Sequence, residues 1–572
     1  MNKKLAKTKK GMAFFFALAM LFGTVGCGAN KEQGDSDDLG NRSPIAKENA
    51  VMLEENADPF SAVSDEKITI HVGREESDVE YPAGEDSYNN YVVKYLEDKL
   101  NVEYVYDFSV DPGSYYTKVS MAISSNSMPD VMCVSYSQMK ELVEAGAVED
   151  MTDAFYTYAS DELLEVMDST NGIADGNATF DGKLMAVPGT YDGMDSVSIM
   201  FIREDWRKQL GLDEPETYED VLELARAFMK KNPGGNVKEG ISADLAIVQP
   251  AGGFGHINPL FNAQGAFPKV WVTQEDGSIA YGSTTKEAKE ALAQIRGLVK
   301  EGLMNPSLAT RDHLTLLEML SNGETGIFFG TWYSYVWPVF DLLEGTDESV
   351  EWKAYLAPAS EDGKINWVMK DPAYTYMVVK KGVSEEVKEG IVKTLNYQLA
   401  LDKTQAAELR SADTPYHWHY SPINMLNGAY DGNEQAAQKV MDCLAGEFAY
   451  EDLNTTEKLC YDSYVKVEEQ GLRECLKSDM NAATYWGYIE GEMLVRKNID
   501  KINKVYSSFY LVTPTMEDKW GTLVAMEEEF YLQVLTGDKS IDEFDDFVKK
   551  WNALGGEKIT QEITEQIKDT DK

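Results

Sequence analysis

The segment KITIHV at residues 67–72 alternates apolar and polar side chains with a period of two, which predicts a β-strand. Residues 88–100 follow with a helical period, in which Val92 and Leu96 fall on one face. A second strand is predicted at residues 102–108. This succession of strand, helix and strand predicts a parallel sheet covered by helices, and therefore an α/β fold.

The same pattern predicts where a ligand would bind. Another helix and a short apolar strand at residues 129–134 extend the sheet. In open parallel sheets, ligands bind beyond the carboxyl ends of the strands, which here are residues 71–76 and 135–138. We therefore expect Arg74 and Tyr136 to contact a ligand.

The later chain continues with mixed elements and then becomes mainly helical. The predicted elements are a strand at residues 196–202, a helix capped by Thr217, a helix at residues 285–302, a strand at residues 326–330, and helices from residue 384 onward.

The amino terminus has the pattern of a bacterial lipoprotein signal. Lysines within residues 3–10 precede an apolar run at residues 12–22, which is too short to span a bilayer permanently. Small residues then lead to Cys27, the expected lipid acceptor, although Thr24 stands where such signals usually have leucine. We predict a signal peptide at residues 1–26; the alternative is a plain secretory signal with an incidental cysteine.

Residues 27–64 are rich in polar residues and lack periodicity, so we expect a flexible tether. No later run is apolar enough to cross a membrane, so membrane contact is expected only through the lipid. These features predict a location on the outer face of the cell membrane.

Composition limits the partners. The 572 residues carry a formal charge of -44, which repels nucleic acid and anionic lipid. It also disfavours a strongly anionic substrate unless basic residues cluster locally. The length suffices for two lobes.

The cysteines other than Cys27 give little sign of redox chemistry, because none forms a CxxC pair. Cys133 lies in an apolar strand pattern and is expected to be a buried free thiol. A bridge among Cys443, Cys460 and Cys475 stays open.

Several ordered motifs carry a family resemblance. They are MPDV at 128–131, DGKLMAVP at 181–188, FIREDW at 201–206, GLMNP at 302–306 and TPTM at 513–516. On these the chain resembles the extracellular solute-binding proteins of the maltose-binding class (family 1), and within it the long lipoproteins of carbohydrate ABC importers in Gram-positive bacteria.

The resemblance implies a two-lobed periplasmic-binding-protein-like fold of type II, with hinged lobes and a largely helical carboxyl-terminal part. Lobe 1 would comprise residues 65–195 with about 330–385. Lobe 2 would comprise residues 196–329 with about 386–572, with helical elements returning across the hinge. The chain would cross between lobes near residues 188–202 and again near 326–332.

Some relatives carry an aspartate-rich calcium loop, but residues 232–240 lack the spaced carboxylates that such a loop needs. We therefore predict no metal site and no cofactor.

Aromatic residues are the leading ligand-binding candidates, because sugar sites pack aromatic faces against pyranose rings. Trp332 and Tyr333 follow a buried strand at an expected crossing, with lobe packing as the alternative. Tyr191 and Asp192 lie at the other crossing, where a hinge or packing role is equally open.

Tyr374 and Tyr376 form a further candidate pair with the same alternatives. The run HWHY at residues 417–420 offers Trp418 and His419 as ligand contacts. Its two alternate histidines could hold zinc, but no paired ligand is identifiable nearby.

No catalytic motif such as GxSxG, HExxH or a P-loop is present, so we expect a binding protein and not an enzyme. The expected function is capture of a carbohydrate, in particular an oligosaccharide, by lobe closure, and delivery of that carbohydrate to ABC permease subunits. The protein itself is expected to be a monomer. A surface carbohydrate-active enzyme (lyase or glycosidase) and a surface carbohydrate sensor are the alternatives.

Overall fold

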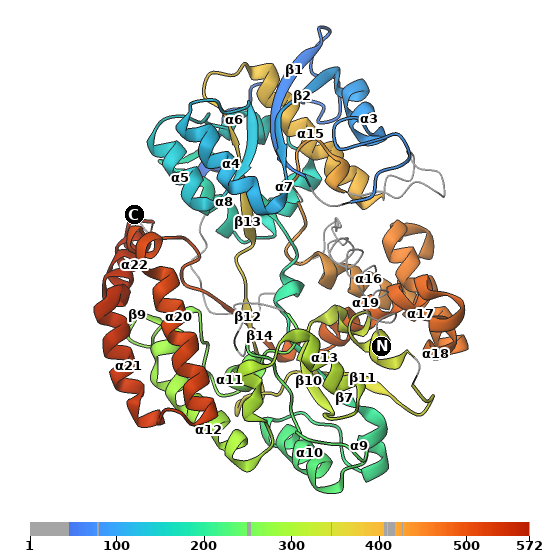
Figure 1. Ribbon diagram of the computed structural model, residues 1–572. Helices are drawn as coiled ribbons and strands as arrows, with labels where there is room; N and C mark the ends of the chain where they lie inside the picture. Colours follow the sequence, from blue (N-terminus) through green and yellow to red (C-terminus); the bar gives the residue numbers. More distant parts are fainter. Residues whose placement is uncertain are drawn as a thin grey trace. The chain divides into compact units, whose positions relative to one another are not determined.

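The computed structural model (Figure 1) describes residues 45–76, 79–246, 248, 253–344, 346–404, 409, 418–425 and 427–570. The chain forms two compact units. Unit 1 comprises Met1–Asp192 and Asp371–Lys458, and unit 2 comprises Gly193–Lys370 and Leu459–Lys572. Cys27 and the predicted signal peptide lie outside the described residues.

Unit 1 is built on a five-stranded sheet of order β2-β1-β3-β13-β6. The strands of this sheet are β1 (Ile68–Glu75), β2 (Val102–Val110), β3 (Val131–Val134), β6 (Val187–Thr190) and β13 (Ala373–Val379). Unit 1 also contains β4 (Thr179–Phe180) and β5 (Lys183–Leu184), which form a separate two-stranded sheet. Its helices are α2 (Ile45–Asn49), α3 (Tyr91–Leu100), α4 (Pro112–Ser124), α5 (Tyr136–Glu144), α6 (Thr152–Tyr158), α7 (Asp161–Asp168), α8 (Ile173–Ala178), α15 (Glu385–Lys403) and α16 (Gly432–Ala445).

The predicted strand–helix–strand succession is confirmed. β1 pairs in parallel with β2 and with β3, and β13 runs antiparallel to β3 and β6. The register of β1 and β2 shifts between Val72 and Gly73, where a β-carbon would clash with the Phe108 ring, so any larger residue would require that ring to move.

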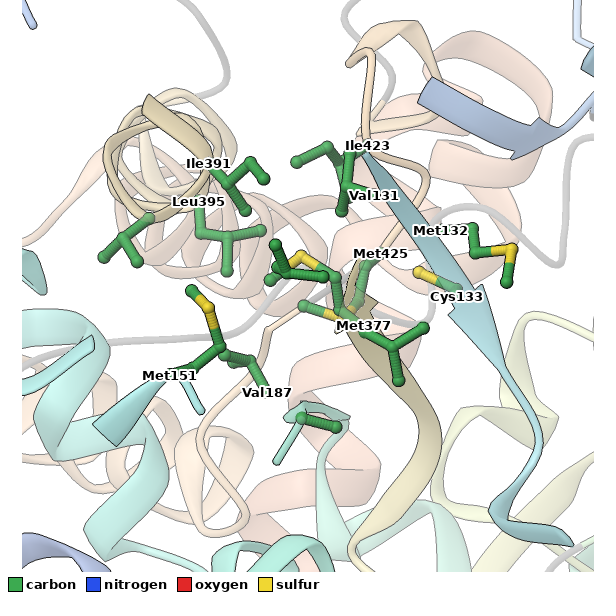
Figure 2. Packing of buried hydrophobic residues seen from close by; sticks show 14 of the residues in the cluster. Val131, Met132, Cys133, Met151, Val187, Met377, Ile391, Leu395, Ile423 and Met425 are labelled. Atoms are coloured by element: carbon green, nitrogen blue, oxygen red, sulfur yellow. The ribbon is translucent and has the colours of Figure 1, made fainter. Parts of the chain in front are cut away.

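The core of unit 1 lies between the sheet and its helices. Figure 2 shows Ile391 and Leu395 of α15 in the same cluster as Val187 of β6 and Met377 of β13. Cys133 of β3 belongs to this core as a buried free thiol, as predicted.

The described part of the predicted tether, residues 45–64, is instead attached to unit 1. The Asn49 amide donates to the Gly182 carbonyl, and the Lys393 ammonium donates to the Ser61 hydroxyl at 2.8 Å. The Asn396 amide donates to the Pro59 carbonyl. The polar composition of residues 45–64 suggested a solvated segment. Hydrogen bonds that join its backbone and side chains to unit 1 instead hold the segment in place.

Unit 2 contains a three-stranded sheet of order β10-β7-β11 and two small two-stranded sheets. Its strands are β7 (Ile199–Arg203), β8 (Trp271–Thr273), β9 (Ile279–Tyr281), β10 (Ile327–Gly330), β11 (Trp352–Leu356), β12 (Ile365–Met369) and β14 (Ile502–Tyr506). Its helices are α9 (Glu204–Leu210), α10 (Tyr218–Lys231), α11 (Asn258–Asn262), α12 (Lys286–Glu301), α13 (His313–Ser321), α14 (Val339–Leu343), α18 (Leu472–Ser478), α19 (Met480–Arg496), α20 (Pro514–Thr536), α21 (Phe544–Trp551) and α22 (Glu557–Thr570), and α17 (Thr455–Gln470) contains the last boundary between the units.

The unit boundaries differ from the predicted lobe ranges. The first boundary, after Asp192, lies close to the predicted residue 195. The predicted crossing near residues 326–332 is wrong, because β10 and β11 both pair with β7 and keep the chain in unit 2 as far as Lys370. Residues 386–458, predicted in lobe 2, belong to unit 1, where α15 packs on the sheet.

Local signals in unit 2 are confirmed. Thr217 caps α10, and Gly302 ends α12 with a φ of 85°. Cys460 and Cys475 of unit 2 and Cys443 of unit 1 are buried and form no disulfide with one another, so the bridge left open among them is absent. Within the described ranges, no helix is both long and apolar enough to traverse a bilayer.

Candidate functional site

A cavity of about 260 Å³ lies in unit 1 at the carboxyl-terminal ends of β1 and β3, the edge where a ligand was expected. We call it the unit 1 cavity. It is lined by Val72, Gly73, Arg74, Glu75, Tyr115, Tyr116, Val131, Met132, Cys133, Tyr374, Thr375, Trp418, Ile423 and Asn424. Its volume is just below the roughly 300–1,000 Å³ of sites for drug-sized ligands, so it suits one ring of a longer molecule.

Aromatic side chains form part of the wall. Tyr116 of α4 is 43% exposed and Tyr374 of β13 is 39% exposed, so both rings are open to solvent. Trp418 is buried, and its indole N–H has no hydrogen-bond partner among the described residues. Open rings and a donor without a partner are what a polar molecule with one apolar face requires.

Arg74 supports the cavity from inside the protein. The side chain is 1% exposed, and its guanidinium donates to the carbonyls of His419 at 2.7 Å and Ser421 at 3.0 Å. It also donates to the carbonyls of Ser87 and Glu75. Four of its five N–H donors are therefore engaged, which makes Arg74 a positioning residue for the 418–424 segment and leaves little for the predicted ligand contact.

The 418–424 segment is also held by Asn424. The Asn424 amide donates to the Glu75 carbonyl at 3.1 Å, and its oxygen lies 2.9 Å from the His419 imidazole nitrogen Nδ1. The predicted His419 thus braces the segment that carries Trp418. His417, the other half of the zinc alternative, lies outside the described residues.

Glu75 contributes a negative charge to the cavity. Its carbonyl accepts from Arg74 and Asn424, but its carboxylate has no hydrogen-bond donor among the described residues. Burial raises the pKa of Glu75, and the Arg74 charge opposes that rise. Burial, and then the Glu75 charge, raises the pKa of the Cys133 thiol to about 12, so this thiol is neutral at physiological pH.

Tyr115 connects the elements around the cavity. Its hydroxyl donates to the Cys133 carbonyl at 2.8 Å and accepts from the Cys133 N–H at 3.2 Å. The ring of Tyr115 contacts that of Tyr116 edge-on, with centroids 5.5 Å apart. This arrangement fixes α4 against β3 and orients the open Tyr116 ring.

Other predicted residues of unit 1 lie outside the cavity lining. Tyr136 and Tyr376 contact each other edge-on with centroids 5.8 Å apart, and Tyr376 is buried. The Tyr191 ring lies against Tyr374, with centroids 5.6 Å apart. Asp192 is buried and accepts a hydrogen bond from the Asn433 N–H.

The predicted ligand-binding residue Trp332 has no solvent-exposed ring face in this structure. Trp332 of unit 2 is completely buried, and its indole N–H donates to Asp195 at 3.2 Å. Its ring contacts Tyr333 and Tyr488. A ring without exposed surface offers no face to a sugar, so Trp332 has the packing role that was its alternative.

Sequence reasoning missed Tyr115, Tyr116, Glu75 and Asn424. Tyr115 and Tyr116 form an adjacent pair in the first turns of the helix that follows β2, which could have placed them near the strand ends. Nothing local in the sequence signals Asn424, because its position depends on pairing across more than 300 residues.

The sequence is similar to that of known solute-binding proteins. The family model of the bacterial extracellular solute-binding protein matches residues 81–398, more than half of the chain. The lipoprotein LipO of Bacillus subtilis is 27% identical over 304 residues, which are 51% of this chain and 56% of LipO. The polygalacturonan/rhamnogalacturonan-binding protein YtcQ of B. subtilis is 22% identical over 223 residues, 37% of this chain and 41% of YtcQ. The chain thus spans about half the length of these curated relatives.

Solved structures agree on the fold. The substrate-binding protein FusA of S. pneumoniae, in complex with kestose, superposes with a TM-score of 0.54 at 16% identity, over 88% of this chain and 99% of FusA. The fold is therefore the predicted α/β, two-lobed, periplasmic-binding-protein-like fold. Because the family model matches more than half of the chain, including parts of both units, the chain is a member of the bacterial extracellular solute-binding protein family.

Proposed function

We propose that this protein captures a carbohydrate, in particular an oligosaccharide, outside the cell and delivers it to an ABC importer without chemical change. The observation that carries the proposal is the unit 1 cavity, where the Tyr116 and Tyr374 rings and the Trp418 N–H stand at the strand ends. Aromatic faces pack against the C–H face of a sugar ring, and polar groups bind its hydroxyls.

The relatives support this class of ligand. FusA was crystallised with kestose, and the name of YtcQ describes a polysaccharide-binding protein. In the proposed mechanism, the ligand stabilises a closed arrangement of the two units and a permease receives it. Cys27, outside the described residues, would hold the protein at the outer face of the membrane.

The proposal is tested by titrating the purified full-length protein with kestose and other neutral oligosaccharides in a calorimeter. We expect saturable binding without release of sugar products. Tyr116→Ala and Tyr374→Ala should each weaken binding by about fivefold, because each removes an aromatic contact worth about 1 kcal/mol. A smaller radius of gyration with ligand, measured by small-angle X-ray scattering, would support closure.

Tyr88→Ala is the matched control. Tyr88 is 44% exposed, like the two cavity tyrosines, but does not line the cavity. Unchanged affinity in Tyr116→Ala and Tyr374→Ala would contradict the proposed site. Appearance of shortened sugars during incubation would contradict a pure binding function and favour the enzyme alternative.

A further inference from the structure

The charge of the unit 1 cavity distinguishes between classes of sugar. Two titratable acid or base side chains of opposite charge type line it among the described residues, Arg74 and Glu75. Arg74 is spent on backbone carbonyls and is almost fully buried, so it has little to offer an incoming carboxylate. Glu75 has a carboxylate with no donor among the same residues.

The position of Glu75 brings its charge to the ligand side of the sheet. Tyr116 and Cys133 line the cavity together with Glu75. Burial is the main cause that raises the pKa of both side chains, and the Glu75 charge adds to the rise in each. For Tyr116, the neighbouring Cys133 also contributes to the rise. Because all three side chains line this one cavity, the Glu75 carboxylate lies within the range where charges interact through protein. A ligand in contact with Tyr116 would therefore feel the same negative charge.

The whole chain adds to this local field, because its formal charge is -44. An anionic sugar would meet repulsion on approach and, on arrival, a carboxylate that has no hydrogen-bond donor among the described residues. A neutral sugar would instead offer hydroxyl donors to Glu75 and hydroxyl oxygens to the Trp418 N–H.

We infer that the unit 1 cavity selects neutral or amino-bearing sugar rings and rejects uronic acids, with Glu75 as the residue that determines this specificity. This inference rests on the proposed function and adds the ligand class to it. It also separates this chain from relatives such as YtcQ, whose name describes binding of acidic pectin-type polymers.

The test compares three trisaccharides on the full-length protein by calorimetry at low salt: kestose, tri-galacturonate and chitosan triose. We expect tri-galacturonate to bind at least about tenfold more weakly than the better of the other two. Glu75→Gln keeps the size of the side chain and removes its charge, so it should reduce this discrimination by about fivefold or more. Added salt should reduce the discrimination in the wild type as well.

Glu103→Gln is the matched control, because it makes the same change in net charge at an exposed position on β2. Tighter binding of tri-galacturonate than of the other sugars, or equal effects of Glu75→Gln and Glu103→Gln on discrimination, would overturn the inference alone. Failure of all three sugars to bind would overturn the proposed function together with it.

Discussion

Arg74 places a positive charge in the interior of unit 1, where its guanidinium donates hydrogen bonds to backbone carbonyls. Buried charges normally require compensation, and here the carbonyl dipoles of three separate segments provide it. One side chain therefore joins the end of β1 to the segment at residues 418–424, which reaches the cavity from the far end of the sequence.

Replacing Arg74 should destabilise unit 1 and loosen the cavity wall. Arg74→Met keeps much of the side-chain volume but leaves the carbonyls of Ser87, His419 and Ser421 without a donor. Each unsatisfied carbonyl costs about 1–3 kcal/mol, so we expect a loss on the order of 3 kcal/mol. The measurements are the thermal unfolding midpoint of the full-length protein and hydrogen exchange at residues 418–425, which should speed up.

Arg226→Met serves as the comparison for Arg74→Met. Arg226 is 39% exposed and pairs with Glu219 and Glu301, a surface arrangement worth about 1 kcal/mol or less. If Arg74→Met unfolded at the same temperature as Arg226→Met and left exchange at residues 418–425 unchanged, the bracing role of Arg74 would be wrong.

At the scale of elements, α20 carries a buried acid against β9 and the turn that follows it. The Glu527 carboxyl accepts hydrogen bonds from the Tyr281 hydroxyl at 2.8 Å and the Ser283 hydroxyl at 2.6 Å. Burial raises the pKa of Glu527 to about 7, although both hydroxyls oppose the rise. Because the folded state holds this proton more tightly than the unfolded state, unit 2 should lose stability as the pH rises from about 4.5 to about 7.

Glu527→Gln should remove this pH dependence. The amide cannot ionise, so the variant should keep the stability that the wild type loses between pH 5 and pH 8. Over this range the unfolding free energy of the variant should therefore rise relative to that of the wild type by on the order of 3 kcal/mol. The measurement is the thermal midpoint of both proteins as a function of pH. Glu517→Gln, at an exposed position on the same helix, should show no such trend. Parallel pH profiles for wild type and Glu527→Gln would contradict the shifted pKa.

The elements also show what could be predicted from the sequence. The β1–α3–β2 succession and the Thr217 cap were predictable, because periodicity and capping are local signals. The attachment of residues 45–64 and the position of Asn424 were not, because both depend on hydrogen bonds to distant segments. The cavity edge was predicted from strand direction, whereas the burial of Trp332 depends on packing against Tyr488 of α19, far along the chain.

At the scale of the molecule, the chain passes between the units three times, after Asp192, Lys370 and Lys458. Each unit therefore consists of two separate stretches of sequence around its own core. Neither unit is a contiguous piece of the chain, so binding and stability must be measured on the full-length protein. Strand β13 and helix α15 of unit 1 follow the first stretch of unit 2 in the sequence.

The attachment of residues 45–64 also bears on how the protein would be held at a membrane. A lipid on Cys27 would be linked to unit 1, since the segment that follows is bound there at Asn49, Pro59 and Ser61. In a Gram-positive host, we expect labelled fatty acid on the wild type and its loss in Cys27→Ser, with that variant moving from the membrane fraction to the medium. Thr24→Leu should raise the lipidated fraction, because it restores the usual residue of the signal. Wild-type protein in the medium, cleaved but without lipid, would support the plain secretory signal instead.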